Sequence, residues 1–415
     1  MVLSILEEKF KTHKTAIAEW LKEKKSQVKG PFYSSIDLRN AGFKIAAIDA
    51  NLFPAGFNNL CPSYTHHASL LAKNYLEKFY PQTKSILLIP ESHTRNLYYL
   101  SNLKRLEIIL KSAGFHVCIG TIHPEFKDEE TVLETAGNDP IVLKKIHHSG
   151  NILKACEEIP DIILLNNDLS KSIPNILKNI DQPIIPNPLL GWAYRKKITH
   201  FNYYRQLIEE FSTLIDIDPW IFLPITEEMD EVHISHKNDN EKIALKAEEL
   251  LKKIQKKYDE YKINEHPYVF IKNSSGTYGI AVEKFESAEE IKNMNRKQKN
   301  KLSVGKGSVK IHSYLIQEGI PTIDRFRSYI AEPVIYLMGN EVIGGFFRLN
   351  DEKDDRSNLN SSGMKFSKLC FHEIMGYHNK YDQKCDLECL TKIYCIIATI
   401  ASIASGYEEK NIVKN

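Results

Sequence analysis

The stretch YVFIKNSSGTYGIAVEKF, residues 268–285, holds two apolar runs separated by a turn of small residues, and it predicts strand, turn, strand. Lys272 ends the first run, and Gly276 and Gly279 lie in the turn. Glycines let backbone N–H groups approach an anion closely, and a lysine adds a point charge. The pattern is typical of a phosphate-binding loop. A hairpin turn with a solvated lysine is an equally good interpretation of these residues alone.

Further polar residues follow this loop in a fixed order. Gln317 and Glu318 end the apolar run SYLI, Arg348 ends the run GGFF, and Asn358 and Asn360 lie in the next loop. This order is that of an ATP-grasp nucleotide cleft. In such a cleft an arginine neutralises charge on a transferring phosphoryl group, and amide oxygens complete magnesium coordination. Taken alone, the arginine also fits a surface ion pair, and Glu332 fits an ordinary acid at a strand edge.

The chain before residue 185 alternates short apolar runs with helical patterns, which predicts a mostly parallel sheet. Ligands gather at the carboxyl ends of the strands in such sheets. Asn51, the loop 91–96 and residues 166–168 are expected there. The predicted strands are 43–53, 85–90, 115–122 and 160–168.

The chain changes character at 182–197, where prolines indicate a domain boundary. Residues 240–262 carry apolar side chains at spacings of three and four, which predicts an amphipathic helix. The β runs beyond it look antiparallel, with a hairpin turn at Gly339-Asn340. We therefore predict an α/β protein: an N-terminal α/β domain with a parallel sheet on the substrate side (1–185), then an ATP-grasp-like α+β half with the nucleotide site (186–415).

Composition narrows the function classes. The 415 residues include 55 Lys+Arg and 53 Asp+Glu, and this near balance argues against a general electrostatic grip on nucleic acid or anionic membrane. No run of about 18 apolar residues is present, so no membrane-spanning helix is expected. Seven cysteines at irregular spacing favour reduced thiols in the cytoplasm. Assembly into a homo-oligomer is left open.

Eight blocks of the sequence resemble, in the same order, a proteobacterial glutamate–cysteine ligase family, the GshA type. The resemblance covers roughly residues 30–375. The blocks are RNAGFKIAAIDANLFPAGFNNL (39–60), LLIPESHTRNLYY (87–99), IILLNNDLS (162–170), GWAYRKKITHFNYY (191–204), KNSSGTYGIAV (272–282), IQEGIPT (316–322), AEPVIYLM (331–338) and GGFFRLN with NLNSSG (344–363).

This resemblance implies the first step of glutathione synthesis. L-glutamate, L-cysteine and ATP would give γ-glutamylcysteine, ADP and phosphate through an acyl phosphate, with Mg²⁺ as the metal. Two alternatives stay open: an ATP-dependent ligase for other amino acids, and an ATP-binding relative without turnover. Asn273-Ser274-Ser275 and Ser357 stand where family members carry acids, and the E-x-N metal pair of ATP-grasp enzymes is missing after residue 363. These departures motivate the second alternative.

The resemblance also implies roles for individual residues. Lys272 and Arg348 are the expected catalytic groups, and Lys272 would also hold phosphates with the glycine loop. The expected nucleotide contacts are Lys272, Gly276, Thr277, Tyr278, Gly279, Gln317, Glu318 and Lys197. The expected amino-acid contacts are Asn51, Asn58, Asn59 and Arg95, the arginine as a clamp for a carboxylate. The expected metal ligands are Glu332, Asn358 and Asn360.

Overall fold

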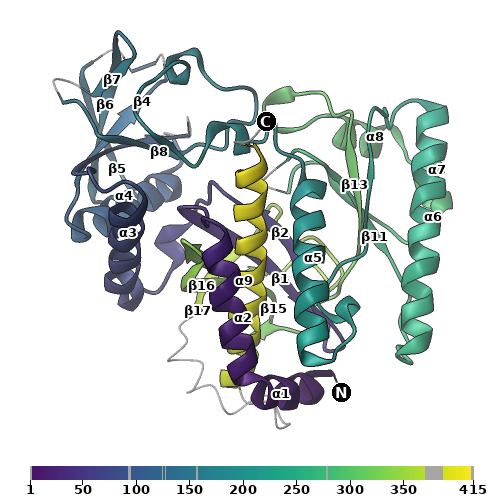
Figure 1. Ribbon diagram of the computed structural model, residues 1–415. Helices are drawn as coiled ribbons and strands as arrows, with labels where there is room; N and C mark the ends of the chain where they lie inside the picture. Colours follow the sequence, from purple (N-terminus) through teal and green to yellow (C-terminus); the bar gives the residue numbers. More distant parts are fainter. Residues whose placement is uncertain are drawn as a thin grey trace.

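The computed structural model describes residues 2–91, 95–123, 125–126, 128–155, 158–276, 279–369 and 387–412, and the following account concerns these residues. They form a mixed α/β protein with three sheets. In Figure 1 a mostly parallel sheet lies at the left and a four-stranded sheet at the right, with an antiparallel sheet and long helices between them.

The first of these sheets has seven strands in the order β5-β6-β4-β3-β8-β9, with β7 beside β6. The strands from β6 to β9 in this order run parallel, as predicted for 85–90, 115–122 and 160–168. Helices α3 (Thr65–Phe79) and α4 (Leu97–Ser112) pack on one face of it. The strand bounds are β3 (Ser85–Pro90), β4 (His116–Thr121), β5 (Glu130–Glu134), β6 (Pro140–Ser149), β7 (Ile152–Ala155), β8 (Ile162–Asn166) and β9 (Ile184–Ile185).

The central sheet is antiparallel, with the order β17-β16-β15-β1-β2 and β14 beside β15. The predicted strand 43–53 belongs here, so its expected place in the parallel sheet was wrong. The turn at Gly42 (φ 81°) folds β2 back on β1, and a hairpin makes the two strands antiparallel. The predicted turn at Gly339-Asn340 is confirmed. The bounds are β1 (Tyr33–Asn40), β2 (Ile45–Asn51), β14 (Arg325–Phe326), β15 (Tyr329–Met338), β16 (Glu341–Asn350) and β17 (Lys365–Leu369).

This central sheet crosses the predicted division of the chain. Residues 33–37 of β1 pair with residues 334–338 of β15, whereas the parallel sheet takes its strands from residues 85–185. The division at residue 185 coincides with the end of β9, but the first two strands lie beside the C-terminal half. The division itself therefore stays a prediction about folding units.

The third sheet has four antiparallel strands in the order β10-β13-β11-β12. The predicted strand–turn–strand of 268–285 forms β11 and β12, and the predicted helix of 240–262 is α6. The apolar positions of α6 are buried, as the spacing indicated. The bounds are β10 (Thr226–Met229), β11 (Val269–Asn273), β12 (Val282–Phe285), β13 (Tyr314–Glu318), α6 (Lys237–Glu260), α7 (Ala288–Lys292) and α8 (Arg296–Ser303).

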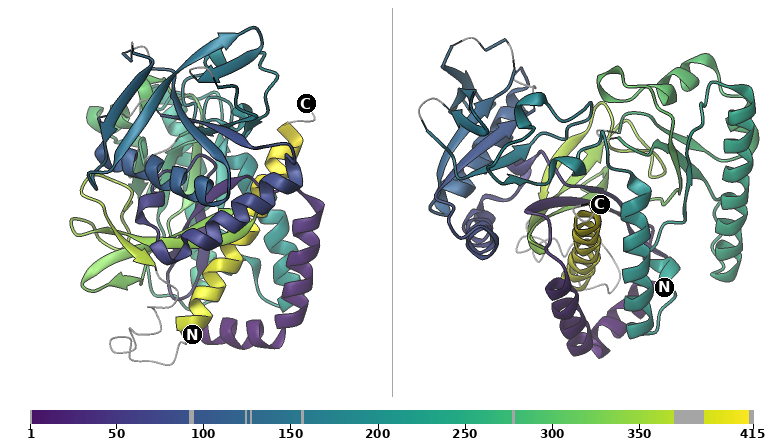
Figure 2. Two further views of the ribbon diagram at one scale, coloured as in Figure 1. Left: turned by 90° about the vertical axis from the view of Figure 1, so that its left-hand side faces the viewer. Right: turned by 45° about the horizontal axis from the view of Figure 1, so that its top comes forward.

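Long helices cover one face of the central sheet. Figure 2 shows α9 beside the N-terminal helices, and side chains of α9 and β1 share one apolar core. The N-terminal segment forms two helices that meet near residue 13. The bounds are α1 (Val2–Thr12), α2 (Lys14–Gln27), α5 (Lys197–Ile215) and α9 (Leu387–Ile412). Single turns of 3₁₀ helix occupy Phe57–Asn59, Pro62–Tyr64, Asn175–Leu177, Pro188–Leu190, Pro219–Ile221 and Lys306–Ser308.

Helix α9 bears on the expectation that no helix spans a membrane. Its segment Leu390–Ile412 is long and apolar enough to cross a membrane by length and composition alone. However, 67% of its most apolar window is buried inside the protein. Residues such as Ile397 and Ala401 are fully buried against the central sheet. The helix therefore serves as a core helix in this fold.

Candidate active site

Two adjoining cavities lie between the four-stranded sheet and the central sheet. Both open to solvent, and their empty space, counted together with the solvent at their mouths, is about 310 and about 450 Å³. Both are lined by Ile48 from β2, Lys272 from β11, Val282 from β12 and Asn358 from the loop after β16. The site thus draws on strands from three distant parts of the chain.

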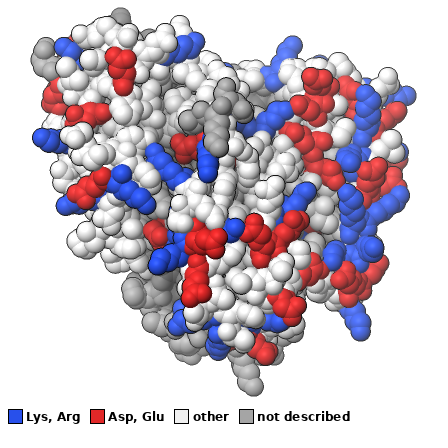
Figure 3. Space-filling model, viewed as in Figure 1, with Lys and Arg blue, Asp and Glu red and all other residues white. Residues whose placement is uncertain are grey.

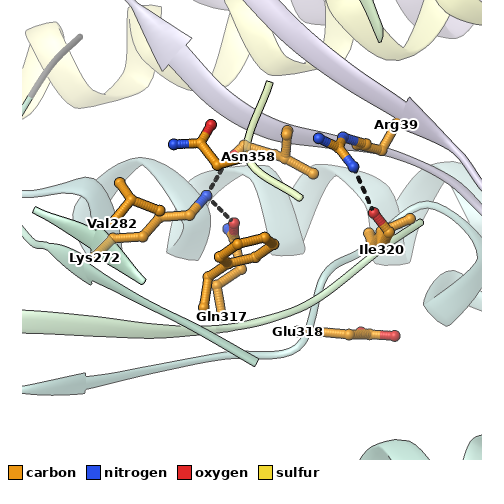
Figure 4. A pocket seen from close by; sticks show the side chains of 9 residues that line it. Arg39, Lys272, Val282, Gln317, Glu318, Ile320 and Asn358 are labelled. Atoms are coloured by element: carbon orange, nitrogen blue, oxygen red, sulfur yellow. Dashed lines mark hydrogen bonds between the residues drawn. The ribbon is translucent and has the colours of Figure 1, made fainter. Parts of the chain in front are cut away.

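The first cavity is an apolar slot with polar groups along its wall. Apolar lining comes from Ile48, Phe270, Val282 and Ile320, and polar lining from Arg39, Lys272, Gln317, Glu318 and Asn358. Lys272 Nζ donates to Gln317 Oε1 over 2.6 Å, as Figure 4 shows. Gln317 Nε2 is buried, and it has no hydrogen-bond partner among the residues that the structure describes. A buried donor of this kind is costly unless something binds it, which suits a ligand with an acceptor atom.

Lys272 is poised in a low-dielectric environment. Burial lowers the pKa of its ammonium to about 8, and the nearby Asp49 carboxylate only partly offsets this effect. A bound anion beside Nζ would favour the charged form.

Glu318 also lines the first cavity, and its expected contact with a base or ribose stays a prediction. Successive residues of a strand point to opposite faces, and Figure 4 shows its side chain directed away from Lys272. Its carboxylate binds Lys44 Nζ over 2.7 Å, and neither side chain is exposed. It also accepts from Trp220 Nε1 and from the backbone N–H of Ile225. The carboxylate is thus part of the protein core.

The second cavity holds a network of buried charges. Arg348 donates to both oxygens of Asp37, over 2.7 and 3.3 Å, and to Glu332 Oε1. Arg39 Nε donates to Glu332 Oε2 over 2.8 Å. In the strand register Glu332 lies opposite Arg348, and Asp37 lies opposite Asp49. These groups therefore share the face of the central sheet that looks into the cavity.

A second ion pair completes the network. Lys197, at the start of α5, binds Asp49 Oδ1 over 2.5 Å. Burial alone would raise the pKa of Asp49, but Lys197 and Lys272 bring it below its ordinary value. Burial raises the pKa of Asp37 despite Arg348, and the two arginines lower that of Glu332 against burial.

The charges of this network do not cancel. Its acids are Asp37, Asp49 and Glu332, and its bases are Arg39, Lys197, Lys272 and Arg348. With every group ionised, one positive charge is left over. The cavity therefore suits an anionic ligand such as a polyphosphate.

The glycine loop packs against the asparagine loop. Gly279 has φ of 64°, and a Cβ there would overlap with the backbone oxygen of Asn360. The Asn273 side chain bonds both the N–H and the C=O of Ser275, which fixes the turn. Gly276, Gly279, Asn358 and Asn360 all line the second cavity. Thr277 and Tyr278 lie outside the described residues.

The expected amino-acid contacts lie elsewhere. Asn51 Oδ1 accepts from the Phe53 N–H, so this side chain shapes the turn after β2. Asn58 Nδ2 bonds Asn59 Oδ1 over 3.3 Å. Arg95 lies in an exposed turn before α4. None of these four lines either cavity. Asn51 ends β2, which lies in the central sheet and not in the parallel sheet as expected. The contacts of all four with an amino acid stay a prediction.

Comparison with protein families gives one assignment. The family model of GshA, glutamate-cysteine ligase, matches residues 7–409. The chain belongs to this family. It is therefore a member of a ligase family that serves glutathione biosynthesis.

Solved structures agree with this assignment. A provisionally named gamma-glutamylcysteine synthetase from Methylobacillus flagellatus KT is 37% identical, with a TM-score of 0.90, over 99% of this chain and 96% of that chain. Two others are remote: D-alanyl-alanine synthetase A from Vibrio cholerae (10% identity, TM-score 0.34, 77% and 81% coverage) and a glutathione synthetase-like effector from Globodera pallida (11%, 0.35, 88% and 80%). These two decide nothing. A search of curated proteins gave no significant match.

Sequence reasoning missed several charged residues of this GshA family member. Asp37, Arg39 and Asp49 line the cavities, and Lys44 holds Glu318. A signal was available, because ionisable residues alternate with apolar ones in SSIDLRN and stand alone in IAAIDAN. A charge within a buried strand must be paired or bind a ligand.

The second cavity offers several oxygen atoms that could coordinate magnesium. Among the described residues, no group of three or more His, Cys, Asp or Glu side chains is placed to hold a metal ion. Each oxygen of Glu332 accepts from an arginine. Asp49, Asn358 and Asn360 still offer oxygen donors, and Mg²⁺ in nucleotide sites needs only one or two carboxylates besides phosphates. The residues fit magnesium that arrives with a polyphosphate.

Proposed function

We propose that this ligase binds ATP across the two cavities and joins the γ-carboxylate of L-glutamate to the amine of L-cysteine. The base would occupy the slot beside Phe270, and the phosphates would extend into the second cavity. The observation that carries the proposal is the surplus positive charge beside an apolar slot, in a chain of this family. The proposed arrangement is ATP-grasp-like: the four-stranded sheet covers the nucleotide from one side and the central sheet from the other.

The reaction we propose has two displacements. A γ-carboxylate oxygen of glutamate attacks the γ-phosphorus of ATP, and the bond to the bridging oxygen breaks to release ADP. The uncharged amine of cysteine then attacks the acyl carbon, phosphate leaves, and the amine gives up a proton. The products are γ-glutamylcysteine, ADP, phosphate and a proton.

Lys272 and Arg348 would carry the charge stabilisation. Lys272 would bind a phosphate oxygen, which favours its ammonium form over the neutral amine. Arg348 is held by Asp37 and Glu332 before any ligand arrives, so its guanidinium needs no reorganisation during transfer. Lys197, at the start of α5, binds Asp49 and lines the same cavity, so we propose that it contacts the same phosphates. Positioning and charge neutralisation supply most of the catalysis in such transfers.

Magnesium, when bound, screens the charge of the phosphates. We propose that Asp49, Asn358 and Asn360 hold it together with phosphate oxygens. The turn that lacks the family's acids is still ordered, because Ser274 Oγ bonds Glu228 and Ser275 Oγ bonds the backbone oxygen of Arg195. We therefore expect turnover rather than ATP binding alone. We also place the enzyme in the cytoplasm, where its thiol substrate stays reduced.

One experiment tests the proposed function. Purified protein is given ATP and magnesium with glutamate alone, with cysteine alone, and with both. ADP release that needs both amino acids, with γ-glutamylcysteine identified by mass spectrometry, is the expected result. ADP release with another pair of amino acids would show that the substrates are not glutamate and cysteine. ATP binding without ADP release would show that the protein is an inactive relative of the ligases.

A second experiment tests the nucleotide site. Lys272→Ala should abolish ATP binding in calorimetry, whereas Lys284→Ala on the neighbouring strand should leave it unchanged. Lys284 is a matched control because it pairs with Glu286 at the surface. Normal ATP binding by Lys272→Ala would overturn the placement of the phosphates.

A further inference from the structure

Lys306 joins two parts of the molecule that lie far apart in the sequence. Its Nζ is 2.9 Å from Glu91 Oε1 and 2.9 Å from Asp168 Oδ2. Side-chain exposure is 17% for Lys306, 11% for Glu91 and 4% for Asp168. A lysine held by two buried carboxylates differs from the exposed ion pairs that are interspersed over the face shown in Figure 3.

Lys306 and the two carboxylates that bind it lie on the sides of different sheets. Glu91 directly follows β3, and Asp168 lies two residues after β8, at the carboxyl edge of the parallel sheet. Lys306 lies in the loop 304–310 between α8 and β13, on the side of the four-stranded sheet. The contact therefore spans the space between the two outer sheets of Figure 1.

Each of these two sheets packs an apolar core against the central sheet, but in the part of the chain that the structure describes their buried side chains do not share a core directly. Among the described residues, the buried side chains of β11 and β13 belong to one core, together with α5, α6 and α9. The buried side chains of β3 and β8 belong to two other cores. The direct contact of Lys306 with Glu91 and Asp168 is therefore polar, at the edge of units that apolar packing joins only through the central sheet.

The loop that carries Lys306 also supports the phosphate-binding turn. The N–H of Gly305 donates to Val309 O over 2.8 Å, which closes the loop on itself. A Cβ on Gly305 would lie 3.1 Å from Asn273 Nδ2, so the loop backs directly onto Asn273. Asn273 lines the second cavity and shapes the turn that leads to Gly276. A shift of Lys306 would therefore reach the cavity wall.

We propose that Lys306 is a positioning residue. By binding Glu91 and Asp168 it holds the loop 304–310, and through that loop Asn273, in the position that forms the wall of the second cavity. The proposal rests on the proposed function only for the identity of the ligand of that cavity as ATP. Lys306 itself touches no substrate and acts through the loop.

The test compares Lys306→Met with a charge-swapped double variant, Lys306→Glu with Glu91→Lys. The swap keeps two acids and one base at the same three positions. Lys301→Met is the matched control, because Lys301 lies on α8 and pairs at the surface with Glu283. The measurements are the Kd of ATP by calorimetry, KM for ATP, kcat and Tm.

We expect Lys306→Met to weaken ATP binding and raise KM for ATP by about tenfold or more. The reason is that the variant loses the hydrogen bonds from the charged lysine to Glu91 and Asp168, which hold the loop in place. The effect on kcat should be smaller, the swap should restore most of the affinity, and Lys301→Met should resemble the native protein. Unchanged ATP binding in Lys306→Met would overturn the proposal. So would a lower Tm with no recovery of ATP binding in the swap, which would indicate a purely structural role.

Failure of the proposed function gives a different result. If no γ-glutamylcysteine forms but ATP binding still depends on Lys306 as described, the positioning role stands and the ligation is refuted. If γ-glutamylcysteine forms and the Lys306 variants bind ATP as the native protein does, the ligation stands and the positioning role is refuted.

Discussion

Replacing Lys272 by methionine should remove ATP binding and yet make the ligand-free protein more stable at neutral pH. Burial lowers the pKa of Lys272 from its ordinary 10.5 to about 8. At about 1.4 kcal/mol for each pKa unit, keeping this lysine charged in the folded protein costs about 3 kcal/mol. Water still reaches part of the side chain, and methionine forfeits the hydrogen bond from the charged ammonium to Gln317, worth about 1.5 kcal/mol. We therefore expect a net gain of about 1–2 kcal/mol.

The way in which the stability difference between Lys272→Met and the native protein changes with pH separates the cost of a buried charge from simple repacking. Below pH 8 the lysine is charged in both folded and unfolded states, so the full cost is present. Between about pH 8 and 10.5 the folded protein releases the proton first, and the cost disappears. The advantage of Lys272→Met should therefore shrink over this range. Lys44, whose pKa burial also lowers to about 8, is present in both proteins, so its contribution cancels in the difference.

The assay is urea unfolding of both proteins at pH 7, 8, 9 and 10, with calorimetry of ATP binding at pH 7. A stability difference that does not change with pH would refute the argument from burial. A variant less stable than the native protein at pH 7 would show that the Gln317 bond outweighs the buried charge. ATP binding retained by Lys272→Met would refute the phosphate contact.

Three further predictions follow from the same geometry. Arg348→Lys keeps the charge but loses the planar fork, so kcat should fall at least about tenfold with little change in ATP affinity; steady-state kinetics with calorimetry would show this, and an unchanged kcat would contradict a role in transfer. Lys44→Met leaves the carboxylate of Glu318 buried and unpaired, which should cost about 3–5 kcal/mol in urea unfolding, and a cost below about 1 kcal/mol would contradict the buried pair. Gly279→Ala should weaken ATP binding in calorimetry, because a Cβ there overlaps the asparagine loop. Gly114 also has positive φ but has nothing near its Cβ, so Gly114→Ala should affect ATP binding little. Equal effects of the two substitutions on ATP binding would contradict the packing argument.

Local patterns in the sequence determined much of this fold. The strands at 85–90, 115–122 and 160–168, the amphipathic helix and the glycine loop follow from periodicity and turn residues that act over a few positions. The order of Lys272, Gln317, Arg348 and the asparagines also predicted which residues meet at one site. The strands, the helix and the glycine loop depend on residues that are neighbours in the chain. The set of residues at the site depends on the order of motifs along nearly the whole chain.

Tertiary structure alone decided which charges face each other. Alternation along β1 indicates that Asp37 and Arg39 share a face, but it does not tell which strand lies beside them. The pairing of β1 with β15, and of β15 with β16, places Asp37 against Arg348, 311 residues away. Packing of the four-stranded sheet beside the turn before β2 brings Glu318 to Lys44. A buried charge is stabilised by whatever group lies within a few ångströms in space, and sequence spacing carries no information about that distance.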